Sequence, residues 1–201
     1  MDAAGWDERY RGSELVWKAE PNRFVEQELA GQEPSGRAVD LAAGEGRNAV
    51  WLAERGWEVD AVDFSAVALE KAERLAAERG VRLRTVHADL TLWTAPKAMY
   101  DLALIAYLHL PWPEMTEVLL RAATAVRGGG TLLLVGHHAA NPERGYGGPQ
   151  DPHVLYTAEQ VADLWRPYAD ILRAETVTRP VTDAEGNSHT ALDTLVHAVR
   201  R

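Results

Sequence analysis

Three aspartates, Asp40, Asp63 and Asp89, stand in or directly after three successive apolar segments of the sequence. The first two flank Gly44-Glu45-Gly46-Arg47-Asn48-Ala49, which fits the pattern G-x-G-x-x-A. Glycine in such a turn lets backbone N–H groups approach a ligand closely. Asp63 lies 19 residues after Gly44, where a carboxylate can accept hydrogen bonds from ribose hydroxyls. The pattern predicts a site for an adenosine-containing ligand.

A nicotinamide dinucleotide and S-adenosylmethionine (SAM) both fit such a turn. Asp40, four residues before Gly44, would be a fixed anion beside the pyrophosphate of a dinucleotide, whereas SAM carries an ammonium and a sulfonium there. Asp89 can accept a hydrogen bond from an adenine amino group while Leu90 flanks the ring. No Tyr-x-x-x-Lys pair occurs, which removes one common dehydrogenase arrangement. These features favour SAM. An NAD(P)-dependent oxidoreductase and a non-catalytic SAM-binding protein remain the alternatives.

The elements that must position these residues alternate along the chain. A C-terminal pair of strands, RAETVTRPV and TALDTLVHAV, surrounds the turn TDAEGNSH and predicts an antiparallel hairpin. The alternation predicts an α/β fold with a doubly wound, mostly parallel sheet and ligands at the carboxyl ends of its strands. The strands are expected at 38–42, 58–62, 82–87, 102–107 and after Gly128–Gly130, and the helices at 23–30, 47–55, 65–80, 113–126 and 157–167.

Length and composition limit the class of protein. A chain of 201 residues suits a single domain spanning 1–201. The net charge of −9 disfavours nonspecific binding to nucleic acid. The absence of cysteine excludes disulfides and thiolate chemistry. No apolar run approaches the ~20 residues of a membrane helix, and the opening MDAAGWDERY lacks the features of a secretory signal, so a cytoplasmic protein is expected.

Together these motifs resemble those of the class I SAM-dependent methyltransferases. The matching stretches are DLAAGEGRN (40–48), Asp63-Phe64, Ala88-Asp89-Leu90, YDL leading to Ala106-Tyr107, and the triple glycine at 128–130. The resemblance covers about residues 6–201. It is closest to small single-domain enzymes such as the tellurite-resistance and thiopurine methyltransferases, which share G-x-G-R-N and an aromatic opening. It implies a Rossmann-like, seven-stranded sheet ending in an antiparallel hairpin.

The same resemblance implies SAM as cofactor and methyl transfer to a small-molecule acceptor by in-line displacement. A monomer or homodimer without nucleic-acid or membrane partners is expected. One position departs from the family pattern, because Ala42 stands where glycine is usual; its methyl group is tolerable there if its φ is negative. The cofactor-binding residues implied are Trp17, Asp40, Ala42, Gly44, Gly46, Asn48, Asp63, Phe64, Ala88, Asp89, Leu90 and Ala106.

Polar side chains are expected around the reaction centre. Tyr107 and His109 follow the fourth strand and His137 ends the fifth, so these three are the catalytic candidates. His109 can act as a base, since its ordinary pKa of ~6.5 lies near neutrality, or can orient the loop against Trp112. The N-P-P-Y and D-P-P-Y runs of amino-methyltransferases are absent, which disfavours adenine, cytosine and glutamine-amide acceptors. Oxygen, nitrogen, sulfur and the heavier chalcogens selenium and tellurium stay open.

The resemblance implies that the N-terminal arm closes over SAM and substrate, and a second segment is expected to act as a lid. Residues 1–31 form an N-terminal arm and helix, and residues 137–156 form a Gly- and Pro-rich lid loop that carries Tyr146 between glycines. His137 and His138 are adjacent on a strand and point to opposite faces, so no metal site is expected. The substrate-binding candidates are Tyr10, Tyr107, His109, His137 and Tyr146.

Overall fold

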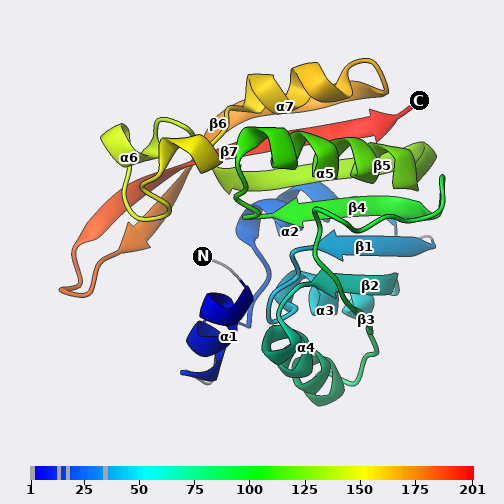
Figure 1. Cartoon of the computed structure of the whole chain (residues 1–201), viewed down its shortest axis with the longest axis horizontal. Coiled ribbons are helices and arrows are strands. Elements are labelled where there is room, and N and C mark those ends of the chain that lie inside the picture. The colour runs from blue at the N-terminus through cyan, green and yellow to red at the C-terminus, as the bar shows by residue number, and fades with distance from the viewer. Residues whose placement is uncertain (1–2, 13–14, 17–18, 34–35) are drawn as a thin grey trace.

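A computed structural model describes residues 3–12, 15–16, 19–33 and 36–201 of the chain. The described residues form one seven-stranded sheet in the order β3-β2-β1-β4-β5-β7-β6 (Figure 1). Strands β1 to β5 pair in parallel, and β7 runs antiparallel to both β5 and β6. The predicted Rossmann-like sheet with an antiparallel C-terminal hairpin is confirmed. The strands are β1 (Arg37–Leu41), β2 (Glu58–Asp63), β3 (Arg84–His87), β4 (Tyr100–Ala106), β5 (Val126–His137), β6 (Ala169–Thr182) and β7 (Ser188–Arg200).

Helices cover both faces of the sheet, which explains why its central strands are apolar throughout. Helices α5 (Trp112–Ala125) and α7 (Ala158–Trp165) pack on one face. Helices α2 (Arg23–Leu29), α3 (Arg47–Glu54) and α4 (Ala66–Glu78) pack on the other. Three predicted helix starts are confirmed: Asn22 caps α2, Ser65 caps α4, and Thr157 with Gln160 forms a capping box on α7.

The N-terminal arm contains a helix that the sequence pattern did not predict. Helix α1 (Ala3–Arg11) lies against α4 (Figure 1). It has no clear hydrophobic period, and contacts between residues four apart support it instead. The rings of Trp6 and Tyr10 stack with centroids 5.5 Å apart, and Arg11 pairs with Asp7 at 3.5 Å.

The triple glycine, after which the fifth strand was expected to begin, instead lies inside β5. The pairing of β5 with β4 shifts register between Tyr100 and Leu102, next to these glycines. A Cβ atom on Gly130 would lie 2.8 Å from the carbonyl oxygen of Asp101 and 2.6 Å from Val126 Cγ1. Glycine is therefore required there by the close approach of two strands rather than by a turn.

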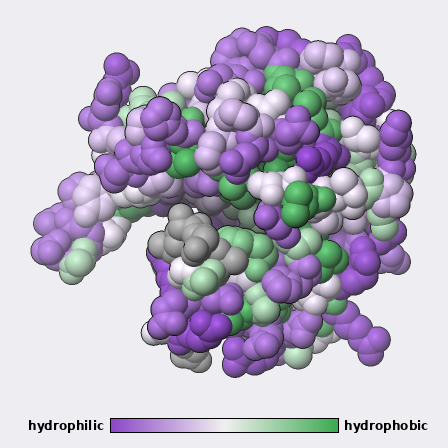
Figure 2. All heavy atoms as spheres, viewed as in Figure 1, coloured by the Kyte–Doolittle hydropathy of each residue, from purple (hydrophilic) through white to green (hydrophobic). Residues whose placement is uncertain are grey.

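The hairpin of β6 and β7 projects beyond the rest of the sheet, with hydrophilic side chains over its surface (Figures 1 and 2). The segment between β5 and α7 contains α6 (Asn141–Arg144) and the short 3-10 helix η1 (Pro152–Val154). Within it, the ring of Tyr146 stacks on His189 of β7 at 4.0 Å. None of the helices described is both long and apolar enough to cross a bilayer.

Candidate functional site

The glycine loop turns tightly where β1 and β2 end. The backbone N–H groups of Ala42 and Ala43 both donate to the carbonyl of Val62, at 2.9 and 3.0 Å. Gly44 and Gly46 have φ values of 54° and 80°, in the left-handed region that favours glycine. A Cβ atom on Gly46 would lie 2.6 Å from Ala72 Cβ of α4, so glycine also permits α3 to pack closely on α4.

Ala42 shares this left-handed backbone, with φ 64°. The condition under which its methyl group was expected to be tolerable, a negative φ, is not met. The turn at the end of β1 imposes this conformation because it directs two consecutive N–H groups at one carbonyl of β2. A residue with a Cβ atom is strained in that region, so the departure from the family pattern has a conformational cost.

Asp40 is fully buried in β1, and neither of its carboxylate oxygens has a hydrogen-bond partner among the described residues. The backbone N–H of Ala49 points toward it without completing a hydrogen bond. Burial, together with the charge of Asp63, raises the pKa of Asp40 to about 7. Buried carboxylates are normally paired, whereas no described residue donates a hydrogen bond to Asp40.

Arg47, in the first turn of α3, is the cation whose charge acts on this acid. Its charge lowers the pKa of Asp40, and burial lowers the pKa of Arg47 itself. No hydrogen bond or ion pair of the Arg47 guanidinium is found within the described ranges. Within the described ranges, a carboxylate and a guanidinium without hydrogen-bond partners thus lie near one another beside the glycine loop. The sequence analysis did not identify Arg47 as a site residue.

Asp63 ends β2 beside the glycine loop, as predicted. Its two oxygens accept the backbone N–H groups of Gly44 and Ser65, at 2.8 and 2.9 Å. Burial raises its pKa although both hydrogen bonds lower it. Asp89, after β3, is exposed and accepts the backbone N–H of Thr91 at 2.8 Å. The acids of three strands therefore gather at one edge of the sheet.

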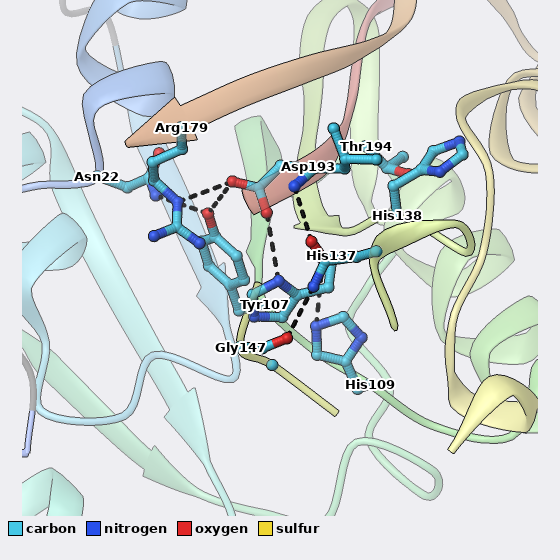
Figure 3. Close-up of polar contacts among 12 residues, drawn as sticks. Asn22, Tyr107, His109, His137, His138, Gly147, Arg179, Asp193 and Thr194 are labelled. Carbon is cyan, nitrogen blue, oxygen red and sulfur yellow. Dashed lines mark hydrogen bonds and ion pairs between the residues drawn. The ribbon is translucent and has the colours of Figure 1, made fainter. Parts of the chain in front are cut away.

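Tyr107 directly follows β4 and contacts two residues of the C-terminal hairpin (Figure 3). Its hydroxyl donates to Asp193 Oδ2 at 2.7 Å, and Arg179 Nε donates to the same oxygen at 2.8 Å. His137 Nδ1 lies 3.3 Å from the other oxygen, Oδ1. Asp193 is fully buried. Burial raises its pKa, but the contacts with His137 and Arg179 outweigh burial and hold the pKa below its usual value.

Sequence reasoning missed Arg179 and Asp193. The one available signal was a charged residue in the apolar strand TALDTLV, and its partners depend on the register of β7 with β5 and β6. His137 and Asp193 are direct cross-strand partners, which places their side chains on the same face of the sheet.

His109 is held by both of its ring nitrogens. Nδ1 lies 3.3 Å from the carbonyl oxygen of Val154, and Nε2 accepts the backbone N–H of His137 at 3.4 Å. Burial and the neighbouring His137 lower the pKa of His109 to about 4, so the ring is neutral at pH 7. Its ring also stacks on Tyr156 at 5.7 Å. These contacts favour a role for His109 in orienting the loop over a role as a general base.

The remaining predicted residues are placed as follows. Asn48 Oδ1 accepts the backbone N–H of Asn22 at 2.8 Å, so its side chain fixes the start of α2. Tyr10 is buried, with its hydroxyl 3.0 Å from where a Cβ atom of Gly44 would stand. Trp17 lies outside the described residues. Leu90 is buried, whereas Phe64, Ala88 and Ala106 are partly buried.

Tyr146 is 41% exposed and rests on the hairpin rather than near Tyr107, so its contact with a substrate stays a prediction. The described part of the chain holds no group of three or more Asp, Glu or His side chains that could bind a metal ion.

The chain is similar to known proteins both in sequence and in structure. A family model described as a methyltransferase domain matches residues 38–130. The chain is 30% identical to part of the probable non-canonical nonribosomal peptide synthetase CymA of Salinispora arenicola, over 68% of this chain and 2% of the synthetase. It is 31% identical to the demethylmenaquinone methyltransferase of Thermus thermophilus, over 62% of this chain and 55% of that enzyme.

The crystal structure of TehB from Haemophilus influenzae superposes with a TM-score of 0.76 at 14% identity, over 90% of this chain and 63% of TehB. The resemblance to class I SAM-dependent methyltransferases is confirmed for residues 38–130, which match a methyltransferase domain. The chain spans about half the length, or much less, of the two sequence relatives named above.

Proposed function

We propose that this chain transfers the methyl group of SAM to a small-molecule acceptor by in-line displacement. The observation that supports this most directly is Asp40 of β1, a fully buried carboxylate that has no hydrogen-bond partner among the described residues. The ammonium of a bound methionine moiety supplies the missing positive charge, and Arg47 supplies a counter-charge for its carboxylate. A dinucleotide would instead bring a pyrophosphate toward a buried acid.

The other cofactor contacts in this proposal follow the strand ends. Asp63 accepts the ribose hydroxyls, Asp89 accepts the adenine amino group, and Leu90 flanks the ring. When bound, SAM supplies an electrophilic methyl group on a cationic sulfur. The chain contributes alignment and exclusion of water, since Tyr10 and α1 cover the glycine loop. Gly44, Gly46, Asn48, Phe64, Ala88 and Ala106 complete the predicted binding set.

A small acceptor is favoured by the surroundings of Tyr107. Its ring lies 4.9 Å from that of His137, and residues 138–156 run alongside them, so the candidate reaction centre is enclosed by the chain's own segments. The net charge of −9 opposes a nucleic-acid acceptor. The cytoplasmic location and the monomeric or homodimeric state remain predictions from the sequence.

Calorimetric titration with SAM, S-adenosylhomocysteine and NAD, side by side, tests the proposal. Micromolar binding of the first two without binding of NAD is expected, followed by turnover in an acceptor screen with labelled SAM. Binding of NAD alone would overturn the cofactor assignment. Binding of SAM without turnover on any hydroxyl, thiol or amine acceptor would favour the non-catalytic alternative.

A further inference from the structure

Three polar side chains meet where β4 and β5 end, and only one of them retains a free proton acceptor. Burial and the charge of Asp193 raise the pKa of Tyr107 above its usual range, so it is a phenol that donates to Asp193. His109 has both ring nitrogens occupied. His137 Nδ1 is buried and faces Asp193. Its Nε2 is not fully buried and has no hydrogen bond within the described ranges.

Hydrogen bonds from two other residues hold the Asp193 carboxylate in its orientation toward His137. Oδ2 accepts two hydrogen bonds, from Tyr107 Oη at 2.7 Å and from Arg179 Nε at 2.8 Å (Figure 3). The Arg179 guanidinium also lies over the ring of Tyr107, with its Cζ 5.6 Å from the centroid. These contacts leave Oδ1 with no hydrogen bond of its own, directed at His137.

The His137 and Asp193 atoms face one another at 3.3 Å without meeting hydrogen-bond geometry, since Nδ1 and Oδ1 both lack a hydrogen-bond partner. A small rotation of the imidazole ring completes an Nδ1–H···Oδ1 bond. Catalytic hydrogen bonds are often long before the substrate binds. Once formed, this bond places the proton on Nδ1 and leaves the lone pair on Nε2.

We propose that His137 is the proton acceptor of the methyl transfer and that Asp193 is its positioning residue, so that the acceptor is a hydroxyl or thiol that is still protonated at neutral pH. This inference rests on the proposed function. The acceptor atom gives its proton to His137 Nε2 and uses the electron pair left behind to bond the methyl carbon, as the carbon–sulfur bond breaks with its pair on sulfur. The imidazolium then returns the proton to water.

The groups that face His137 come from four elements. Asp193 approaches from β7, Tyr107 from the end of β4, and His109 from the loop after β4, with ring centroids of the last two 4.9 and 5.3 Å from that of His137. Arg179 of β6 lies behind Asp193. The backbone of Gly148 lies beside the ring, since a Cβ atom there would lie 2.8 Å from His137 Nε2.

The tautomer of His137 tests the proposal without any turnover assay. Nitrogen-15 NMR of the histidine rings is recorded at pH 8 on the full chain with S-adenosylhomocysteine, with His137→Gln assigning the signals. The wild type is expected to carry its proton on Nδ1, and Asp193→Asn is expected to lower that fraction. A wild-type ring protonated on Nε2 instead would overturn the proposal, because that nitrogen could not accept a proton.

Turnover gives a second, independent readout. With a hydroxyl or thiol acceptor from the screen, His137→Gln is expected to lose about 10²–10⁴-fold in kcat. His138→Gln is the matched control, because the neighbouring ring accepts the Ala140 N–H and lies away from Asp193. Equal, small losses in the two variants would overturn the role of His137.

Binding of S-adenosylhomocysteine separates this inference from the proposed function. His137→Gln should bind it within about 3-fold of the wild type, because the ring does not contribute to the cofactor site. If neither protein binds, the proposed function has failed. If both bind equally and His137→Gln still methylates hydroxyls and thiols at the wild-type rate, only the inference has failed. Should Asp193→Asn not fold, His137→Gln carries the kinetic test alone.

Discussion

The Lys71 ammonium of α4 lies 3.0 Å from the Glu45 carboxylate of the glycine loop, and both side chains are buried. Lys71 also donates to the backbone oxygen of Tyr10 at 2.5 Å, and both Glu45 oxygens accept the backbone N–H of Val16, at 3.0 and 2.9 Å. One buried ion pair thus connects α4 and the glycine loop to the end of α1 and to the chain after it. It keeps Tyr10 against Gly44.

Lys71→Met is expected to cost about 3–5 kcal/mol of stability, because it removes one partner of a buried ion pair. Urea unfolding measures this loss, and faster proteolysis within the first 20 residues reports release of the arm. Arg79→Met is the control, since it breaks the more exposed pair of Arg79 with Glu54 and should cost at most about 1 kcal/mol. Equal small losses would mean that the buried pair does not hold the arm.

Asp40 makes stability of the unliganded protein depend on pH. Its pKa is about 7 in the folded chain and about 3.9 when unfolded, so the folded chain keeps a proton that the unfolded chain releases between these values. The contribution of Asp40 to the free energy of unfolding is therefore fully present below about pH 4. It is lost as the pH rises through 7, which lowers the free energy of unfolding by roughly 2–4 kcal/mol.

Asp40→Asn should abolish that loss and also weaken binding of S-adenosylhomocysteine by at least about 10-fold. Urea unfolding at pH 5 and pH 8, compared between wild type and variant, isolates the contribution of this one acid. A variant that unfolds with the same pH dependence as the wild type would show that Asp40 is already ionised in the free protein.

Asp63→Ala should weaken binding of SAM by roughly 1–3 kcal/mol, because the charged acceptor for the ribose is lost. It also removes the partner of the Gly44 and Ser65 N–H groups, so unfolding must be measured alongside calorimetry. Asp183→Ala, at the tip of the projecting hairpin, should leave affinity for SAM unchanged. Wild-type affinity in Asp63→Ala would place the ribose elsewhere.

The candidate cofactor half of the site could be predicted from the sequence because its residues follow the order of the strands along the chain. Asp40 and Asp63 belong to β1 and β2, and Asp89 follows β3; parallel strands bring their carboxyl ends to one edge of the sheet. The acceptor half is different. The contact of Asp193 with Tyr107 joins residues 86 apart in the sequence, and the contact with Arg179 depends on the strand register of the hairpin.

Helix α1 was missed for a related reason, since it is supported by stacking and charge pairs and by its contact with α4 rather than by an apolar stripe. The strain at Ala42 was also hidden, because a residue type does not reveal its own φ.

Ala42→Gly is expected to stabilise the protein by about 0.5–1 kcal/mol, since glycine adopts φ 64° without strain. Ala98→Gly is the matched control: Ala98 is exposed, has φ 55° and lies away from the glycine loop. Both variants should gain similar stability in urea, but only Ala42→Gly should tighten binding of SAM. A gain in affinity in both would mean that the methyl group of Ala42 does not limit the cofactor.

Gly147 and Gly148, in the predicted lid loop of residues 137–156, provide a matched pair of positions for substitution. Both have left-handed φ, 73° and 75°, so alanine at either position costs about 1 kcal/mol of backbone strain. At Gly147 a Cβ atom meets nothing within 4 Å, whereas at Gly148 it would lie 2.8 Å from the Cδ2 and Nε2 atoms of His137.

Gly148→Ala should therefore displace the His137 ring and lose at least about 10-fold in kcat relative to Gly147→Ala, at similar stability. The nitrogen-15 signals of His137 should shift in the first variant and stay fixed in the second. If the two variants behave alike in both measurements, the lid does not rest on His137 when the enzyme turns over, and access to Nε2 is set by another segment.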